Sequence, residues 1–286
     1  MTVVREREQT YEECPIGVNW LTQRGFYEGM TAEDQADINS FLLHPDSICG
    51  VSPRLFQSPV ISQIADVAMA NHADQWRKAA PTHPYMKHVF MTTFQVGRLL
   101  PGGDLETSLQ NYIAWYGEVE IPEDELAGAA LLHDTLECNP FKARWHLYND
   151  LVANGVDGEL AECVTATSQF MVPAQKPPHL APERYLEFKE QDVLRYYSDE
   201  AIRRLKLSSR LVARLVKGAD VRAVGKEIID DILKGREGIN LVRPDLFNAA
   251  LDTRLKLIHR RLELFQQHDP LNPFIPAIAE ICEFSI

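Results

Sequence analysis

Apolar residues along this 286-residue chain recur every three or four positions, which is the spacing of one face of an α-helix. No stretch alternates apolar and polar residues as a strand does, and no internal repeat is visible. The pattern therefore predicts an all-α fold. Its expected helices cover residues 59–77, 85–100, 105–116, 124–137, 140–154, 157–170, 182–197, 198–206, 207–234 and 244–268.

Proline and glycine separate these helices. Pro81 and Pro84 end the first one, Pro101 with two glycines ends the second, and residues 171–181 form a proline-rich loop. Further prolines at 270, 273 and 276 predict coil that leads to a short apolar tail. We expect three parts, namely an N-terminal extension (residues 1–55), a central helical domain (56–235) and a C-terminal helical extension packed on the same core (236–286).

Composition narrows the class of protein. The formal net charge is -12, which argues against general nucleic-acid binding, since that requires a basic surface. No segment approaches the roughly 18 apolar residues of a membrane span, and the N-terminus has no apolar stretch of a secretory signal. The five cysteines form no C-x-x-C pair, so a reducing, cytoplasmic compartment is expected.

The chemistry centres on His133 and Asp134, which end an almost wholly apolar helical segment. Burying an adjacent imidazole and carboxylate is costly unless both are paired. A divalent metal resolves this cost, because both groups are ligands for such ions. Glu137 follows one helical turn later, and a carboxylate there could polarise a metal-bound water.

Two other helices supply further ligand types. His88 lies on the amphipathic helix 85–100, and Asp220 ends the apolar run of residues 211–219. Helical bundles build metal sites in this way, from inward side chains on facing helices. The sequence thus predicts a site with four ligands from three helices.

Four segments resemble the HD-domain metal-dependent phosphohydrolases, and most closely the hydrolase domain of (p)ppGpp synthetase/hydrolases and their small single-domain relatives. That branch has A-H-x-x-Q-x-R-K, P-Y-x-x-H, A-x-L-H-D-x-x-E-D and V-K-L-A-D. This chain has the corresponding segments NHADQWRK (residues 71–78), PYMKH (84–88), ALLHDTLEC (130–138) and VKGAD (216–220). The resemblance covers roughly residues 60–225.

The resemblance implies an HD-domain helical bundle with N- and C-terminal helical extensions. It implies that a divalent metal, usually manganese in this family, is held by four residues, which are His88, His133, Asp134 and Asp220. Glu137 would orient or activate the water. Arg77 and Lys78 would lie near the nucleotide, and Lys217 is a further candidate to offset substrate charge.

The chain departs from the family pattern beside the metal ligands. Cys138 stands where the family has a second catalytic Asp, and a thiol does not replace a carboxylate in water activation at neutral pH. Residues 221–224 read VRAV where the family has R-L-H-N, so an Asn that contacts the nucleotide is absent. The gap between His88 and His133 is also longer, through an insertion near residues 101–124.

These features predict a metal-dependent phosphohydrolase that acts on a phosphate ester or pyrophosphate of a small-molecule nucleotide, such as a (p)ppGpp-like substrate. The alternative is a catalytically impaired HD-type domain that binds a nucleotide for regulation, which the change at Cys138 favours. A di-iron oxygenase of HD type would need further histidines near the pair, and the pattern does not place His146 on the same face.

Overall fold

The structure, a computed structural model, describes residues 58–75, 85–172, 182–198, 205–236 and 244–283, together with isolated positions before residue 40. Within these ranges the chain is helical and contains no strand, which confirms the predicted all-α class. The helices are α5 (Pro59–His72), α6 (Met86–Gly97), α7 (Glu106–Trp115), α8 (Glu123–Leu132), α9 (Thr135–Cys138), α10 (Arg144–Ala153), α11 (Gly158–Met171), α12 (Pro182–Leu194), α14 (Leu207–Arg236), α15 (Pro244–His268) and α16 (Ile275–Cys282).

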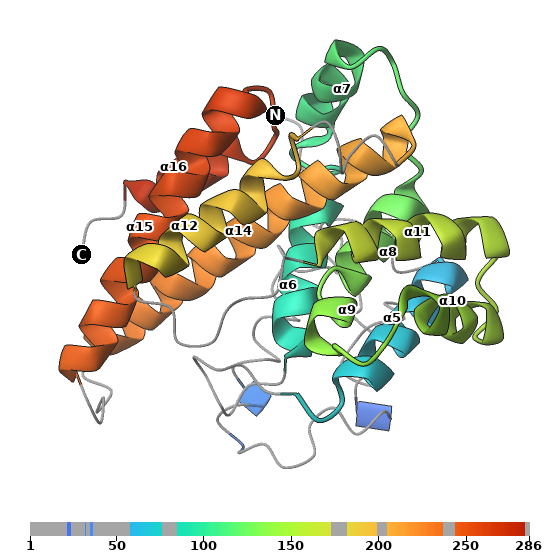
Figure 1. Cartoon of the computed structure of the whole chain (residues 1–286), viewed down its shortest axis with the longest axis horizontal. Coiled ribbons are helices and arrows are strands. Elements are labelled where there is room, and N and C mark those ends of the chain that lie inside the picture. The colour runs from blue at the N-terminus through green and yellow to red at the C-terminus, as the bar shows by residue number, and fades with distance from the viewer. Residues whose placement is uncertain are drawn as a thin grey trace, which may run out of the picture.

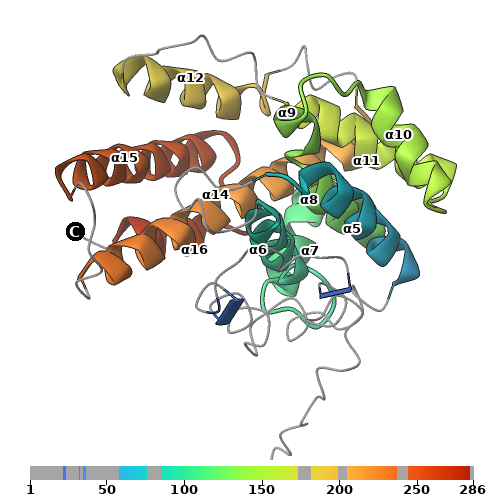
Figure 2. The same cartoon turned by 90° about the horizontal axis from the view of Figure 1, so that it is seen from below.

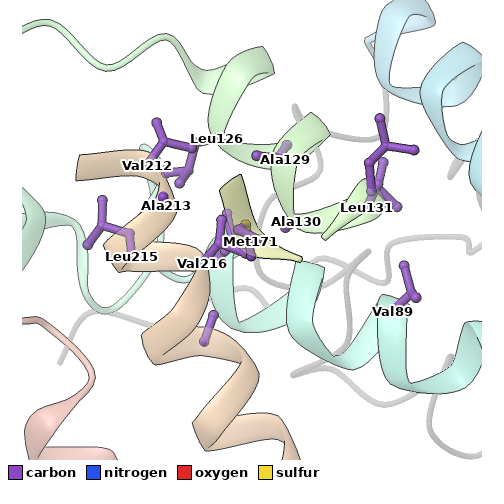
Figure 3. Close-up of a cluster of buried hydrophobic side chains, with 14 of the residues drawn as sticks. Val89, Leu126, Ala129, Ala130, Leu131, Met171, Val212, Ala213, Leu215 and Val216 are labelled. Atoms are coloured by element: carbon purple, nitrogen blue, oxygen red, sulfur yellow. The ribbon is translucent and has the colours of Figure 1, made fainter. Parts of the chain in front are cut away.

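Helix α14 contacts helices in both halves of the molecule. It crosses both halves in Figures 1 and 2, packing on α6, α8 and α11 toward one end and on α15 and α16 toward the other. Figure 3 shows how apolar side chains from four of these helices meet, with Val89 of α6, Ala130 of α8, Met171 of α11 and Val216 of α14 in one cluster. Among the residues that the structure describes, no helix combines the length and apolar character that a membrane span requires.

Helix α6 is enclosed on every side. Residues His88 to Gly97 are all buried, although only one face was expected to point inward. The other face is covered because α6 lies between α14 and α8. Polar side chains of α6 are therefore inside the protein, and one of them is His88, which is 2 % exposed.

Several helix ends differ from the predicted ones. The helix expected over 59–77 ends at His72, and residues 73–75 do not continue it. The helix expected over 124–137 is interrupted at His133 and Asp134, which form a turn between α8 and α9. Of the helix expected over 198–206, residues 199–204 lie outside the described ranges, and 205–206 are not helical.

The prediction of coil at the C-terminus was wrong in part. Helix α16 begins at Ile275, with Pro276 in its first turn. Proline is compatible with this position, because the first N–H groups of a helix have no partner within the helix. The helix buries Ile278 and Ile281, which join the main core. The expected N-terminal extension, residues 1–55, lies outside the described ranges apart from isolated positions.

The close approach of the C-terminal segment explains one difference from the family segment V-K-L-A-D, in which this chain has glycine at position 218. A Cβ atom on Gly218 would lie 2.8 Å from Oδ1 of Asn272 and 2.9 Å from Cδ2 of Phe274. Both neighbours are buried, and Asn272 is held by hydrogen bonds to Asp269 and to the backbone N–H of Phe274. The side chain of a leucine has no room here.

We predict that Gly218→Leu lowers the free energy of unfolding by about 2–3 kcal/mol, because overpacking a filled core forces side chains and backbone apart. Denaturant unfolding measures this loss. The matched control is Gly158→Ala at the start of α11, where the nearest atom to a new Cβ is the Tyr148 hydroxyl at 3.3 Å. The control should change stability by less than ~0.5 kcal/mol. Equal effects of the two substitutions would contradict this view of the α14–α16 contact.

Candidate metal centre

Three buried side chains from two regions of the chain converge at the turn between α8 and α9. Ligand atoms of His88, His133 and Asp134 all lie within 4.8 Å of one another. His133 Nε2 is 3.1 Å from Asp134 Oδ2, and His88 Nε2 is 3.6 Å from the same oxygen. Two imidazoles and a carboxylate gathered in this way could bind a metal ion.

The break between α8 and α9 is what turns this pair inward. His133 follows the last residue of α8, and Asp134 occupies the N-cap position of α9. The preceding helix is buried from Glu125 to Leu132, so the turn lies at the inner end of an apolar element. Because α8 is buried, the two polar residues that follow it also lie inside the protein.

The hydrogen bonds of His133 point to a ligand role. Its Nδ1 lies 2.7 Å from the backbone oxygen of Ala130 and donates to it, so Nε2 is the ring nitrogen that a metal ion could bind. Nε2 is buried, has no hydrogen-bond partner, and faces the Asp134 carboxylate. A buried imidazole nitrogen without a hydrogen-bond partner, beside a carboxylate and a second imidazole, fits the ligand set of a divalent metal.

Asp220 adjoins the same cluster from α14. Its Oδ1 lies 3.3 Å from His88 Nε2, so the structure brings all four predicted ligands together. Burial would raise the pKa of the Asp220 carboxyl, but Lys217 and the two imidazoles outweigh burial and hold this pKa well below its usual range. For Asp134, the adjacent His133 and His88 likewise overcome the effect of burial and lower the pKa. Both carboxylates are therefore ionised, as ligands must be.

Outer residues hold the ligands in place. The Tyr85 hydroxyl donates a hydrogen bond of 2.6 Å to Asp134 Oδ2, and the Tyr85 ring stacks on His72 with centroids 5.1 Å apart. His72 is buried and its Nδ1 is 2.7 Å from Gln75 Oε1, which agrees with a structural role for this histidine. His72, Gln75 and Tyr85 therefore support the site without contributing a ligand atom.

Glu227 was not predicted. Its Oε1 lies 3.4 Å from His88 Nδ1, on the side of the ring opposite to Asp134 and Asp220. A carboxylate at this position orients a metal-binding imidazole and raises its basicity. The sequence held a signal, because Glu227 follows Asp220 by seven residues, or two helical turns on the same face of α14.

The charge of Lys217 is balanced within the protein by two carboxylates. Its Nζ lies 3.0 Å from Asp220 Oδ2 and 3.3 Å from Asp192 Oδ2 of α12, and its side chain is 10 % exposed. Burial would lower the pKa of Lys217, but the two carboxylates raise it above its usual value. In this position the lysine neutralises the Asp220 carboxylate, and contact of Lys217 with a substrate stays a prediction.

Of the three remaining predicted residues, the structure describes Glu137. Glu137, on α9, is exposed, and desolvation by the surrounding protein together with the Asp134 charge raises its pKa. Arg77 and Lys78 lie outside the described residues, so their predicted position near the nucleotide stays a prediction. Glu137 does not belong to the group of converging ligand atoms.

We predict that Glu227→Gln weakens Mn²⁺ binding by about 10–100-fold, because loss of an outer carboxylate costs this much at comparable metal sites. Calorimetric titration of the metal-free protein measures the dissociation constant. Glu263→Gln, on the exposed face of α15, is the control and should bind Mn²⁺ as the unmodified protein does. Unchanged affinity in both variants would show that Glu227 does not orient His88.

Comparison with models of known protein families, with curated protein sequences and with solved structures finds no match for this chain. The resemblance to HD-domain phosphohydrolases therefore rests on the four short segments of sequence. Two of these segments contribute the converging residues His88, His133 and Asp134, and a third contributes Asp220.

Proposed function

We propose that this protein is a metal-dependent phosphohydrolase that cleaves a phosphate ester or pyrophosphate of a nucleotide. The observation that carries the proposal is the buried His133 Nε2, which has no hydrogen-bond partner and faces Asp134 beside His88. With Asp220, these residues would hold one divalent ion. Manganese, the usual metal of the family that the sequence resembles, suits a set of imidazole and carboxylate ligands.

The charges of the four proposed ligands suit a divalent ion that supports hydrolysis of a phosphate ester. Two carboxylates and two imidazoles leave a divalent ion nearly neutralised, and coordination positions remain for water and a phosphoryl oxygen. A bound divalent ion lowers the pKa of water and offsets negative charge on the phosphoryl group. Tyr85 holds Asp134 through its hydroxyl, and Lys217 holds Asp220, so neither carboxylate is free to rotate away.

Glu137 is the residue that we assign to proton transfer. It stands on α9, one turn beyond Asp134, and is exposed to solvent where a substrate would enter. Its raised pKa, caused by desolvation and by the Asp134 charge, brings it closer to neutral pH, as a general base requires. Its carboxylate would accept a proton from the attacking water.

A screen of nucleoside mono-, di- and tetraphosphates with added Mn²⁺ tests the proposal. We expect release of phosphate or pyrophosphate by the unmodified protein, and loss of both bound metal and activity in His133→Ala. Glu137→Gln should keep the metal but lose about 10²–10⁴-fold in kcat, because general-base catalysis contributes this much. Glu123→Gln, an exposed carboxylate at the start of α8, is the matched control. Full activity in His133→Ala would overturn the proposal.

The second candidate function is a regulatory domain that binds a nucleotide without turning it over. It is favoured by Cys138, which ends α9 directly after Glu137 and lines an open hollow of about 770 Å³ shared with residues of α5 and α10. A thiol there supplies no second carboxylate for water activation. Binding without product release, in the screen above, would support this function.

We predict that Cys138→Asp raises hydrolysis of (p)ppGpp by at least about tenfold if this acid is the missing part of the machinery. Phosphate and pyrophosphate release, with metal content measured in parallel, provides the test. Cys163→Asp, on the half-buried face of α11, controls for an added carboxylate elsewhere. No gain in Cys138→Asp, with metal retained, would show that the substrate differs from the family's.

A further inference from the structure

A hollow of about 570 Å³ follows one face of α11, apart from the candidate metal centre. Helix α11 packs against α8, α10 and α14 (Figures 1 and 2). The hollow, which we call the α11 hollow, lies where another face of α11 meets the starts of α10 and α14. Its volume is in the range of sites that hold a small organic molecule. The lining side chains are those of Arg144, Glu159, Glu162, Cys163, Ala166, Gln169, Phe170, Leu205, Lys206 and Ser209.

The α11 hollow combines apolar walls with a rim whose charges cancel. The rim carries two ion pairs, in which Arg144 contacts Glu162 and Lys206 lies 3.7 Å from Glu159. Within the rim, four half-buried side chains present mainly carbon and sulfur, namely Cys163, Ala166, Phe170 and Leu205. These walls suit the apolar body of a ligand, since covering them removes apolar surface from water.

A buried carboxyl group stands behind the wall of the hollow. Ser209, the lining residue that is itself buried, donates a hydrogen bond of 2.6 Å from its Oγ to Oε1 of Glu125 on α8. Glu125 is 3 % exposed, and no cation of the described residues forms an ion pair with it. Its neighbours Glu123 and Asp124 reach solvent, so Glu125 is the acid of this turn that faces the interior. Burying a carboxylate without a cation is costly, even at the start of a helix.

The hydrogen bond of Ser209 determines which ligand group fits beside it. A serine hydroxyl has one proton to donate, and Ser209 gives this proton to Glu125. Toward the hollow, Ser209 therefore offers only the lone pairs of its oxygen, so a complementary ligand group must be a donor. The Glu125 carboxylate behind the hydroxyl favours a donor that is positively charged.

We propose that the α11 hollow binds a small organic cation, namely a protonated amine with an apolar body. Its ammonium group would donate to Ser209 and offset the charge of Glu125, and its apolar body would cover Cys163, Ala166 and Phe170. This site differs from the metal centre, because Glu125 lies in the first turn of α8 and His133 follows its last residue, about 12 Å further along the helix axis. The proposal is independent of the proposed hydrolase activity.

The probes are 2-phenylethylamine and 2-phenylethanol, which have the same size and differ in charge. Alkylation of Cys163 by iodoacetamide in the full-length protein, followed by mass spectrometry, reports occupancy of the hollow that this thiol lines. The amine should slow this reaction with a dissociation constant on the order of 1 mM, and the alcohol should bind at least about fivefold more weakly. Cys282 of α16 does not line the hollow, so its alkylation rate should not change.

Glu125→Gln keeps the shape of the side chain and removes its charge, so this variant should bind the amine and the alcohol about equally. Glu123→Gln, an exposed acid of the same turn, is the matched control and should keep the preference for the amine. Each rate is compared with that of the same variant without ligand, because the Glu125 charge also raises the pKa of the Cys163 thiol. Thermal unfolding verifies that both variants are folded.

Ala166→Phe is a second variant, which fills the hollow from its wall. It should abolish binding of the amine in ligand-observed NMR, a measurement that does not depend on access to Cys163. Ala153→Phe, at the exposed end of α10, is the control and should bind the amine as the unmodified protein does.

Three results would overturn the amine site. They are equal protection of Cys163 by the amine and the alcohol in the unmodified protein, no protection by the amine at ten times the expected dissociation constant, and a preference for the amine that persists in Glu125→Gln. Unchanged binding of the amine in Ala166→Phe would also reject the site. Amine binding by a protein that hydrolyses no nucleotide would leave the site standing and reject only the hydrolase.

Discussion

Burial of ionisable side chains inside an apolar helical core is the constraint on which this structure depends. His88, His133, Asp134 and Asp220 all lie on or beside helices that are otherwise packed with aliphatic residues. Each such group needs a hydrogen-bond or ion-pair partner, because burying it without one costs free energy. The structure meets this demand with the Ala130 carbonyl, the Tyr85 hydroxyl and the Lys217 ammonium, and His133 Nε2 remains buried without a hydrogen-bond partner.

Lys217 connects two parts of the molecule that would otherwise be independent. It balances the charge of Asp220 at the metal centre and, through Asp192, ties α14 to α12. A pairing between two carboxylates and one ammonium is specific in its geometry, so the position of α12 is linked to that of the ligand. Lys217 thus links the candidate metal centre to α12 through one buried side chain.

The candidate site shows which residues local sequence can identify. The ligands His88, His133 and Asp134 were visible because each is polar within an apolar helix, where packing alone gives no reason for it. Glu227 was not identified, since it lies on a helix with several other charged residues, where one more is ordinary. Only the neighbours that this helix acquires on packing make Glu227 a partner of His88.

The sequence by itself determined the helical class, the approximate bounds of most described helices and the identity of the converging side chains, because hydrophobic periodicity and polar residues in apolar runs are local properties. Tertiary structure decided the break at His133 and Asp134, the complete burial of α6 and the formation of α16. Those features depend on which helices pack on each other. The hydrophobic pattern of one helix does not show which neighbours it will contact. The ion pairs of Lys217 with Asp220 and Asp192 also depend on tertiary structure, because α12 and α14 are separate segments that only folding brings together.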